Sequence, residues 1–429
     1  MTDPNAGLWA APSASAPVSG NVHVPGSKSV TNRALLLAAL ATGPTTIRRP
    51  LRSRDTELMA AAIRALGVDV ADRALDWSVT PASLRGPAVV DVGLAGTVMR
   101  FVPPVATLAA GSTVFDGDAR ARERPMGPLL AALRTLGADI DDGSRGALPF
   151  IVNGQGELPG GAVDIDASAS SQLVSALLLT GASWQRGVRV VHVGERPVPN
   201  APHLRMTSSM LRARGVRVDD STPAMWAVEP GPVSPKDEMV EPDLSTAAPF
   251  LAAAAVTGGV ATVENWPVGS CQPGAMLPEL LAHFGAHWQM NGTTLSVSGA
   301  DLHGADLDLR DAGELTPVLA SVAAVASTPS TLRGIDYLRG HETDRLTALA
   351  TELGKLGAGV SVTDDGLRID PRRLSANVFH TYADHRLVMA AAVLGLVVPG
   401  MQVENSAAVA KTFPEFVSEW SRFVGGGAD

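Results

Sequence analysis

One pattern in this 429-residue chain recurs at nearly constant intervals. A helix-like apolar stretch ends at a glycine, and an alternating, strand-like stretch follows at once. The segments are RALGVDV, RTLGADI, RARGVRV, AHFGAHW and GKLGAGV, and their central glycines are Gly67, Gly137, Gly215, Gly285 and Gly357. The intervals between these glycines are 70, 78, 70 and 72 residues. Because glycine adopts the left-handed conformation that commonly ends a helix, each segment predicts a helix that stops at its glycine and leads into a strand.

The repeats also predict the fold class and the domains. A sixth helix-like run, FPEFVSEWSRFV, ends at Gly425, and the extended segment NVHVP near the start of the chain is expected to supply the strand of that unit. Six units divide into two domains of three. We expect one domain to span residues 27–243 and the other to combine 1–26 with 244–429, with PVSPKDEMVEPDLS as the linker. Each unit mixes helix with strand, so the class is α/β or α+β.

Composition excludes several classes of protein. The net charge of −9 argues against a general nucleic-acid-binding surface, and a single cysteine, Cys271, excludes an internal disulfide or a thiolate zinc cluster. We interpret Cys271 as a small buried residue rather than a reactive thiol. The longest apolar runs fall short of the ~18–20 residues that span a bilayer, and the first residues do not form a signal peptide. We therefore expect a cytoplasmic protein with neither nucleic-acid nor membrane partners.

Lysine is rare in this chain, with four residues against 30 arginines. Lys28 lies with Ser29 and Arg33 in VPGSKSVTNRALLLAAL, where a helix begins. Cations at a helix start oppose the helix dipole, so their presence indicates an anion from outside. Free backbone N–H groups, a hydroxyl and two cations form a phosphate site, although the segment is not a P-loop. The alternative is a solvated basic turn.

Polar residues gather at further predicted helix starts. They are Gly96, Thr97 and Arg100 in AGTVMR; Arg120, Arg122 and Arg124 in RARERP; Ser168, Ser170, Ser171 and Gln172 in SASSQ; Asp311 and Glu314 in RDAGELTP; Arg339, His341, Glu342, Asp344 and Arg345 in RGHETDR; Asp384, His385 and Arg386 in ADHR; and Lys411 in AVAKTFPEF. Helix capping is an alternative for the serines and acids, and a structural ion pair is one for Arg100. Together the cations predict a cleft for substrates with several negative charges, with Glu314 and Glu342 available for acid–base work.

These motifs, in this order from about Val22 to Phe416, resemble the 5-enolpyruvylshikimate-3-phosphate synthase family of enolpyruvyl transferases. The resemblance implies two domains, each of three βαβαββ units with helix N-termini directed toward an interdomain cleft. It implies transfer of the enolpyruvyl group of phosphoenolpyruvate to the 5-hydroxyl of shikimate 3-phosphate through a tetrahedral intermediate, with release of phosphate. This is a step of the shikimate pathway to chorismate and the aromatic amino acids. The resemblance implies no metal or organic cofactor, and we expect a monomer.

The resemblance also implies roles by position. The catalytic positions match Lys28, Glu314, Glu342 and His385, where Glu314 activates the hydroxyl and Glu342 is the candidate proton donor to C3. Asp311 is the alternative to Glu314. The shikimate 3-phosphate contacts match Lys28, Ser29, Arg33, Ser170, Ser171, Gln172, Asn200, Glu314, Arg339 and His341. The phosphoenolpyruvate contacts match Lys28, Gly96, Arg120, Gln172, Arg345, Arg386 and Lys411.

The chain departs from the family pattern at Leu94, Asn200, Tyr337 and His341, which leaves the contacts of Arg339 and His341 open. Gly96 is the small residue found in glyphosate-sensitive members. One alternative is the UDP-N-acetylglucosamine enolpyruvyl transferase, which generally carries a cysteine on a mobile loop of one domain, whereas Cys271 lies in the other half of this chain. A second is a non-catalytic phosphosugar-binding protein, and the acids Glu314 and Glu342 argue against it.

Overall fold

The computed structural model describes residues 7–425. Its contacts divide the chain into two compact units, Gly26–Glu241 and a unit that joins Met1–Pro25 to Pro242–Asp429. From the sequence we expected the domain boundaries after residues 26 and 243. Sheets and helices alternate in both units, so the mixed α/β class is confirmed.

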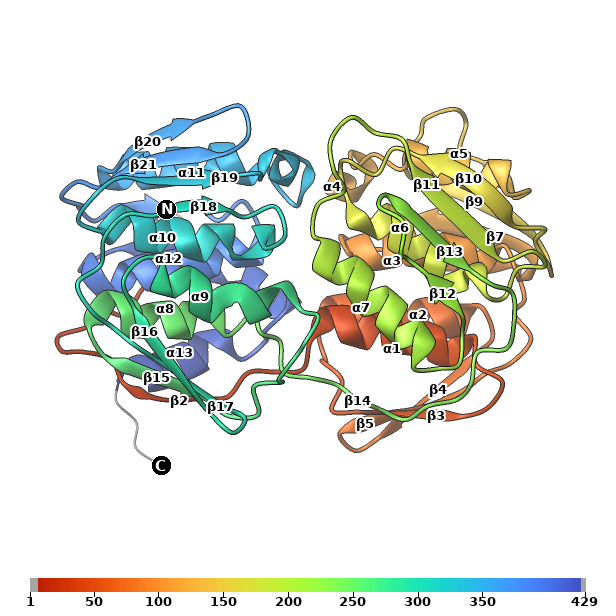
Figure 1. The fold of residues 1–429 in the computed structure, drawn as a ribbon, viewed down its shortest axis with the longest axis horizontal. Coiled ribbons are helices and arrows are strands. Elements are labelled where there is room, and N and C mark those ends of the chain that lie inside the picture. The colour runs from red at the N-terminus through yellow and green to blue at the C-terminus, as the bar shows by residue number, and fades with distance from the viewer. Residues whose placement is uncertain (1–6, 426–429) are drawn as a thin grey trace, which may run out of the picture. The chain divides into compact units, whose positions relative to one another are not determined.

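The unit Gly26–Glu241 contains three four-stranded sheets that share one strand order (Figure 1). The first is β14 (Glu238–Met239), β3 (Thr45–Arg48), β5 (Asp76–Thr80) and β4 (Asp69–Arg73). The second is β6 (Ala88–Asp91), β7 (Ala110–Asp116), β9 (Phe150–Gln155) and β8 (Asp139–Asp141). The third is β10 (Gly161–Ile165), β11 (Val188–His192), β13 (Met225–Val228) and β12 (Val218–Asp219). In each sheet the first two strands pair in parallel and the others are antiparallel.

Three buried helices of this unit pack against one another: α1 (Lys28–Ala39), α3 (Gly96–Ala106) and α6 (Ser171–Gly181). Their residues are buried on nearly every side, as expected for helices that are apolar all round. The other helices are α2 (Arg54–Ala65), the short α4 (Ala119–Arg122), α5 (Gly127–Thr135) and α7 (Ala201–Arg212). Along the chain, each of the three buried helices is followed by the second strand of one of the three sheets.

The other unit repeats this plan. Its first sheet is β16 (His287–Asn291), β17 (Thr294–Ser298), β15 (Val260–Val263) and β2 (Gly20–Val22). Its second is β18 (Asp306–Asp308), β19 (Ser330–Arg333), β21 (Leu367–Asp370) and β20 (Gly359–Val362). Its third has three strands, β1 (Leu8–Ala10), β23 (Gln402–Glu404) and β22 (Val378–Phe379).

The buried helices of this unit are α8 (Ala248–Thr257), α10 (Thr316–Val325) and α12 (His385–Val397), which pack against one another (Figure 1). Their runs of small apolar residues, such as LAAAAV in α8, allow close approach of the helix axes. The remaining helices are α9 (Leu277–Ala282), α11 (Arg345–Leu356) and α13 (Phe416–Val424), with 3₁₀ turns η1 (Pro273–Met276), η2 (Gly313–Leu315), η3 (Asp336–Gly340) and η4 (Ser406–Lys411).

The five repeated glycines have the predicted conformation. Gly67, Gly137, Gly215, Gly285 and Gly357 have φ values of 98°, 107°, 78°, 101° and 110°, and they follow α2, α5, α7, α9 and α11. A strand begins two or three residues after each one. Gly425 differs, because it ends α13 in a right-handed conformation with φ −73°.

Two expectations about chain connections are wrong. The first two residues of NVHVP, Asn21 and Val22, belong to β2, which pairs in parallel with β15, while the sixth unit is completed by β1, antiparallel to β23. The segment PVSPKDEMVEPDLS is more than a linker, because it contains β14, which pairs in parallel with β3. The physical reason is the same in both cases. The strand that precedes α1 is β2, and it pairs with β15 of the unit that contains Pro242–Asp429. The parallel edge strand of the sheet that follows α1 is therefore β14, which comes from a later segment of the chain.

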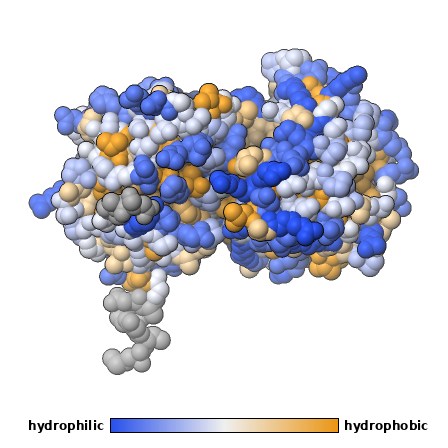
Figure 2. Space-filling view, turned by 90° about the horizontal axis from the view of Figure 1, so that it is seen from below, coloured by the Kyte–Doolittle hydropathy of each residue, from blue (hydrophilic) through white to orange (hydrophobic). Residues whose placement is uncertain are grey.

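On the face shown in Figure 2, hydrophilic residues cover most of each unit's surface, and hydrophobic ones lie singly or in small groups. Scattered apolar residues of this kind are ordinary on a folded protein. No helix within residues 7–425 is both long and apolar enough to cross a membrane.

Candidate active site

The N-terminal halves of the buried helices in the unit Gly26–Glu241 are joined by side-chain hydrogen bonds. Asn32 of α1 donates to Thr97 Oγ1 of α3 at 2.7 Å. Arg100 of α3 donates to Gln172 Oε1 of α6 at 2.6 Å. Because these contacts join the N-terminal halves of the three helices, the three N-termini lie at one end of the unit. Their dipoles therefore favour negative charge at that end.

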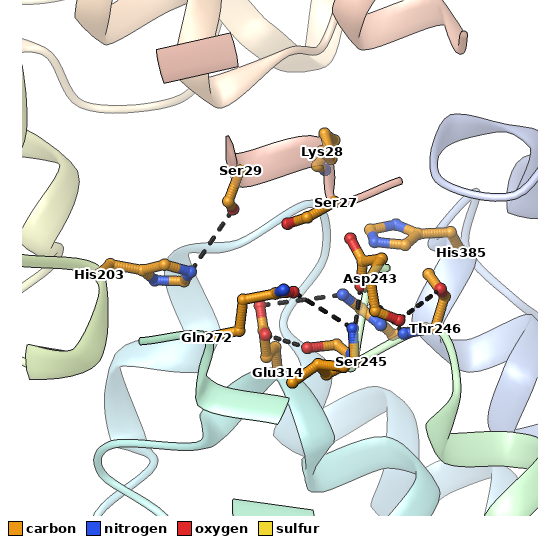
Figure 3. A network of polar contacts seen from close by, with 12 residues as sticks. Ser27, Lys28, Ser29, His203, Asp243, Ser245, Thr246, Gln272, Glu314 and His385 are labelled. Carbon is orange, nitrogen blue, oxygen red and sulfur yellow. Dashed lines mark hydrogen bonds and ion pairs between the residues drawn. The ribbon is translucent and has the colours of Figure 1, made fainter. Parts of the chain in front are cut away.

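Lys28 and Ser29 occupy the first turn of α1, where Ser27 is the N-cap. Lys28 Nζ lies 3.3 Å from Asp55 Oδ2, with side-chain exposures of 17% and 3%. Ser29 Oγ lies 3.5 Å from His203 Nε2 of α7 (Figure 3). The lysine is thus held by a buried carboxylate and keeps part of its surface accessible, as a substrate-binding cation requires.

Arg33 is the most enclosed of the predicted binding residues in this unit, with 1% exposure. Its Nε donates to Thr207 Oγ1 at 2.8 Å, and its Nη1 donates to the Ser29 carbonyl at 3.1 Å. The guanidinium also lies over the Phe101 ring, 5.1 Å from the centroid. These contacts connect α1, α3 and α7, so Arg33 fixes the position of Ser29.

The serines before α6 include one helix cap. Ser170 is the N-cap, and its side chain accepts from the Gln172 N–H at 3.2 Å, so the capping interpretation is correct for this residue. Ser171 is buried in the first turn. Asn200 is the N-cap of α7, with φ 54° in the left-handed region, where asparagine is favoured among non-glycine residues.

The three arginines around α4 have different surroundings. Arg120 pairs with Glu123 and is half-exposed, and Arg122 pairs with Asp116 at 2.7 Å. Arg124 is buried, with 6% exposure. An added Cβ on Gly96 would lie 3.1 Å from both terminal nitrogens of Arg124, so Gly96 allows close approach of that guanidinium to the start of α3.

In the other unit, Glu314 lies in η2, just before α10. Ser245 Oγ donates to Glu314 Oε1, and Arg386 Nη2 lies 3.8 Å from Glu314 Oε2 (Figure 3). The carboxylate is partly exposed, at 21% of its side-chain surface, while Arg386 is buried at 6%. Glu314 therefore presents a partly accessible basic oxygen beside a fixed positive charge.

Arg345 forms the centre of a buried charge network at the start of α11. Its Nε and Nη2 donate to the two carboxylate oxygens of Asp384 at 2.7 and 3.2 Å, and its Nη2 donates to Glu342 Oε2 at 3.0 Å. Burial alone would lower the pKa of Arg345, but the charges of Asp384 and Glu342 outweigh it and raise the pKa. The arginine therefore stays charged at any pH that the protein experiences.

Lys411 joins this network from η4. Its Nζ donates to Glu342 Oε1 at 2.7 Å, and both side chains are 10% exposed. Phe413 and Phe416 of the same KTFPEF motif pack on Phe250 of α8, with ring centroids 6.2 and 5.8 Å apart. The aromatic contacts thus hold the segment that carries the lysine, and Glu342 lies between two cations.

Asp384 is the N-cap of α12, because its side chain accepts from the Arg386 N–H at 2.8 Å. His385 follows, with Nδ1 3.6 Å from Asp384 Oδ1. Tyr382 and Ala383 precede the cap with φ values of 52° and 54°. Two successive non-glycine residues in the left-handed region are strained, and such strain clusters at functional sites.

The titration of Tyr382 tests whether Glu352 holds this turn through a hydrogen bond. Its hydroxyl donates to Glu352 Oε1 at 2.7 Å, and partial burial, together with that carboxylate, raises the pKa of Tyr382 to about 12. The chain has two tyrosines, so a Tyr337→Phe variant reports on Tyr382 alone. In an ultraviolet titration at pH 11 we expect about a tenth of its phenol to be ionised, against about nine tenths for an ordinary tyrosine. Glu352→Gln should move the titration to lower pH, and a midpoint near 10 in the Tyr337→Phe protein would contradict the assignment.

Arg339 and Tyr337 lie at the edge of the network. Arg339 is partly exposed and lies 3.6 Å from Asp344 Oδ2. Tyr337 donates its hydroxyl to the Arg310 carbonyl at 3.2 Å, and its ring centroid lies 5.8 Å from that of His341. His341 Nδ1 in turn lies 3.4 Å from Arg345 Nη1. The structure thus connects His341 with the charge network and leaves Arg339 outside it.

A family model described as EPSP synthase (3-phosphoshikimate 1-carboxyvinyltransferase) matches residues 12–420. The chain belongs to the EPSP synthase family. It is 51% identical over 433 residues to a 3-phosphoshikimate 1-carboxyvinyltransferase of Kocuria rhizophila, covering 97% of each chain. The resemblance noted in the sequence motifs is therefore confirmed.

Solved structures agree with this family. An EPSP synthase from Acinetobacter baumannii matches with a TM-score of 0.80 and 26% identity over 97% of each chain. The enolpyruvyl transferase NikO from Streptomyces tendae matches with a TM-score of 0.76 and 19% identity, also over 97% of each chain, which shows a common fold.

Sequence reasoning missed several residues that surround the EPSP synthase motifs. His203 contacts Ser29 from 174 positions away, and no local pattern signals such a contact. Asp55 has the appearance of an ordinary acid in the first turn of α2, which suits the helix dipole, yet it holds Lys28. Ser245, which contacts Glu314, lies in the segment interpreted as a linker. Within residues 7–425, no group of three or more His, Cys, Asp or Glu side chains is arranged to hold a metal ion.

Proposed function

We propose that the polar residues at the helix starts of both units bind and convert the two substrates of the EPSP synthase reaction. As a member of this family, the chain transfers the enolpyruvyl group of phosphoenolpyruvate to the 5-hydroxyl of shikimate 3-phosphate. The O5–C2 bond forms as C3 gains a proton. The tetrahedral intermediate then loses a proton from C3 and breaks its C2–O bond to phosphate, leaving an enol ether.

The observation that carries this assignment is that each carboxylate proposed for proton transfer contacts a cation. Glu314 lies beside Arg386, and Glu342 accepts from Lys411 at 2.7 Å. Glu314 takes the proton of the 5-hydroxyl. The Glu342–Lys411 pair delivers the proton to C3, and His385 acts near the reacting carbons. This separation of roles is what general acid–base catalysis needs.

The remaining residues bind the anionic groups. We assign shikimate 3-phosphate to Lys28, Ser29, Arg33, Ser170, Ser171, Gln172, Asn200, Glu314, Arg339 and His341. We assign phosphoenolpyruvate to Lys28, Gly96, Arg120, Gln172, Arg345, Arg386 and Lys411. Charge-assisted hydrogen bonds from arginine forks and lysine suit phosphate and carboxylate. Besides this assigned contact, the buried Arg33 holds Ser29 in place, because its Nη1 donates to the Ser29 carbonyl.

We also propose that the protein works as a cytoplasmic monomer. The net charge of −9 supports solubility and argues against binding to nucleic acid or to anionic lipid. Sedimentation at several protein concentrations tests the monomer, and a mass of two chains at low concentration would contradict it.

Phosphate release tests the proposed function. With phosphoenolpyruvate present, we expect the protein to release inorganic phosphate when shikimate 3-phosphate is added, and to release none when UDP-N-acetylglucosamine replaces it. A protein that binds shikimate 3-phosphate without releasing phosphate would instead be a non-catalytic binding protein.

Glyphosate should inhibit this chain. Gly96 leaves space at the start of α3 that a Cβ would fill, at 3.1 Å from Arg124 and 3.2 Å from Arg100. We expect inhibition that competes with phosphoenolpyruvate, and a Gly96→Ala variant should lose affinity for the inhibitor and for phosphoenolpyruvate. Initial rates at several concentrations of both compounds measure this. Unchanged turnover at high inhibitor concentration would refute the prediction.

A further inference from the structure

His192 lies outside the assigned binding residues, yet its ring contacts two loops of the unit Gly26–Glu241. It is the last residue of β11, and it is partly buried. The backbone N–H of Ala167, in the loop between β10 and α6, donates to its Nδ1 at 3.1 Å. Its Nε2 lies 2.8 Å from the carbonyl oxygen of Arg196, in the loop between β11 and α7. The imidazole therefore joins the loop before α6 to the loop before α7.

The two partners determine where the ring carries its proton. A backbone N–H can only donate a hydrogen bond, and a carbonyl oxygen can only accept one. Nδ1 is therefore the bare nitrogen that accepts from Ala167, and Nε2 holds the proton that it donates to Arg196. A neutral imidazole with its proton on Nε2 satisfies both loops at once.

Ser168 and Gly194 complete this contact between the loops. Ser168 Oγ donates to the same Arg196 carbonyl at 3.1 Å, and the Ser168 N–H donates to Asp166 Oδ1 at 2.9 Å. A Cβ on Gly194 would overlap Asp166 Oδ1 and Ser168 Oγ and would lie 2.6 Å from His192 Cε1. The three side chains thus fill the space that glycine leaves open, and the cluster is closely packed.

Each of the joined loops leads to residues assigned above to shikimate 3-phosphate. Ala167 accepts from the Ser170 N–H at 3.0 Å, and Ser170 and Ser171 follow at the start of α6. Arg196 precedes Asn200, the N-cap of α7. A change in the separation of the two loops would therefore move the serines relative to Asn200.

We propose that His192 is a positioning residue for shikimate 3-phosphate, because it fixes the serine loop before α6 against the loop that carries Asn200. The inference rests on the proposed function, which assigns Ser170, Ser171 and Asn200 to this substrate. The affinity for phosphoenolpyruvate depends much less on His192, since Gln172 is the one residue assigned to phosphoenolpyruvate alongside Lys28 that also belongs to the shikimate 3-phosphate set.

The first test compares His192→Leu with His192→Asn. Leucine removes both hydrogen bonds of the ring, so KM for shikimate 3-phosphate and its calorimetric Kd should rise about 10-fold, with kcat and KM for phosphoenolpyruvate changed less than about 3-fold. Asparagine keeps an acceptor near the place of Nδ1, so its values should fall between those of the wild type and of His192→Leu. Equal rises of the two KM values, or a His192→Asn protein no better than His192→Leu, would overturn the proposal.

His303→Leu is the matched control. His303 is an exposed histidine of the other unit, and its Nδ1 lies 3.1 Å from the carbonyl oxygen of its neighbour Gly304. The same substitution there should leave both KM values at the wild-type level. A rise of KM for shikimate 3-phosphate in this control equal to that in His192→Leu would contradict a specific role for His192.

Gly194→Ala tests the cluster without touching the histidine. Gly194 is not among the glycines with positive φ, so alanine fits its backbone, while the added methyl displaces the side chains of Asp166, Ser168 and His192. We expect KM for shikimate 3-phosphate to rise here as well. Combined with His192→Leu, the rise should be smaller than the product of the two single effects, because both changes act on one cluster. An unchanged KM in the folded Gly194→Ala protein would count against the proposal.

Nuclear magnetic resonance reads the ring directly. In protein with ¹⁵N-labelled histidine at pH 8, above the ordinary titration range of the side chain, the signal that disappears in His192→Asn belongs to one of the nine histidines, His192. It should show the proton on Nε2, and a proton on Nδ1 would overturn the proposal.

These measurements also separate this inference from the proposed function. If the wild type releases phosphate normally and His192→Leu matches it in both KM values, the role of His192 alone is wrong. If the wild type binds shikimate 3-phosphate but releases no phosphate, the proposed function is wrong, and the calorimetric Kd values of the variants still decide the role of His192.

Discussion

Replacing Lys28 by alanine is expected to lower kcat/KM by more than about 100-fold, because groups that stabilise developing charge or transfer protons contribute factors of 10²–10⁴. Lys28 is one of four lysines in the chain, and Asp55 holds it at 3.3 Å at the start of α1. We propose that it contacts both substrates, so the loss should raise both KM values as well as lower kcat. Steady-state kinetics with each substrate varied in turn measure this.

The controls distinguish catalysis from folding. Removal of Lys28 takes a cation away from the buried Asp55 carboxylate, which costs stability by itself. A Lys28→Ala, Asp55→Asn double variant removes that cost and should remain as inactive as the single variant. Lys236→Ala changes a half-exposed lysine that pairs with Glu238 and should keep full activity. Turnover near the wild-type level in a folded Lys28→Ala protein would refute the role of Lys28.

The fold was predictable where local chemistry alone determines it. A helix commonly ends at a residue with positive φ, and five glycines supplied that signal at a nearly constant spacing. The pairing of β2 with β15 and the pairing of β14 with β3 were not predictable in this way. Both β2 and β14 are strands of two or three residues whose partners lie more than 180 positions away, and a parallel edge pair leaves no local pattern.

For the candidate site too, local preferences were predictable from the sequence and contacts with distant segments were not. The serines, acids and arginines at helix starts could be recognised in the sequence because the first turn of a helix has known residue preferences. Whether a side chain at such a place is paired or unpaired depends on contacts from distant segments. Arg120 and Arg124 are four residues apart in one arginine-rich run, yet one is half-exposed beside Glu123 and the other is buried beside Gly96. Sequence spacing carries no information on that difference.

The second large effect is expected at Glu314, which we propose as the base for the 5-hydroxyl. Glu314→Gln keeps the size of the side chain and its ability to accept from Ser245, but it removes the basic oxygen beside Arg386. We expect kcat to fall by about 10²- to 10⁴-fold, with KM for phosphoenolpyruvate little changed.

Asp311→Asn is the matched control, because the sequence left open which of the two acids is the base. Both precede α10, but Glu314 is the one that the structure places beside Arg386 and Ser245. We expect Asp311→Asn to keep activity within about 3-fold of the wild type. The opposite result, an active Glu314→Gln and an inactive Asp311→Asn, would transfer the role of base to Asp311. Glu314→Asp provides a further check, since a shorter carboxylate retains basicity and should recover more activity than the amide does.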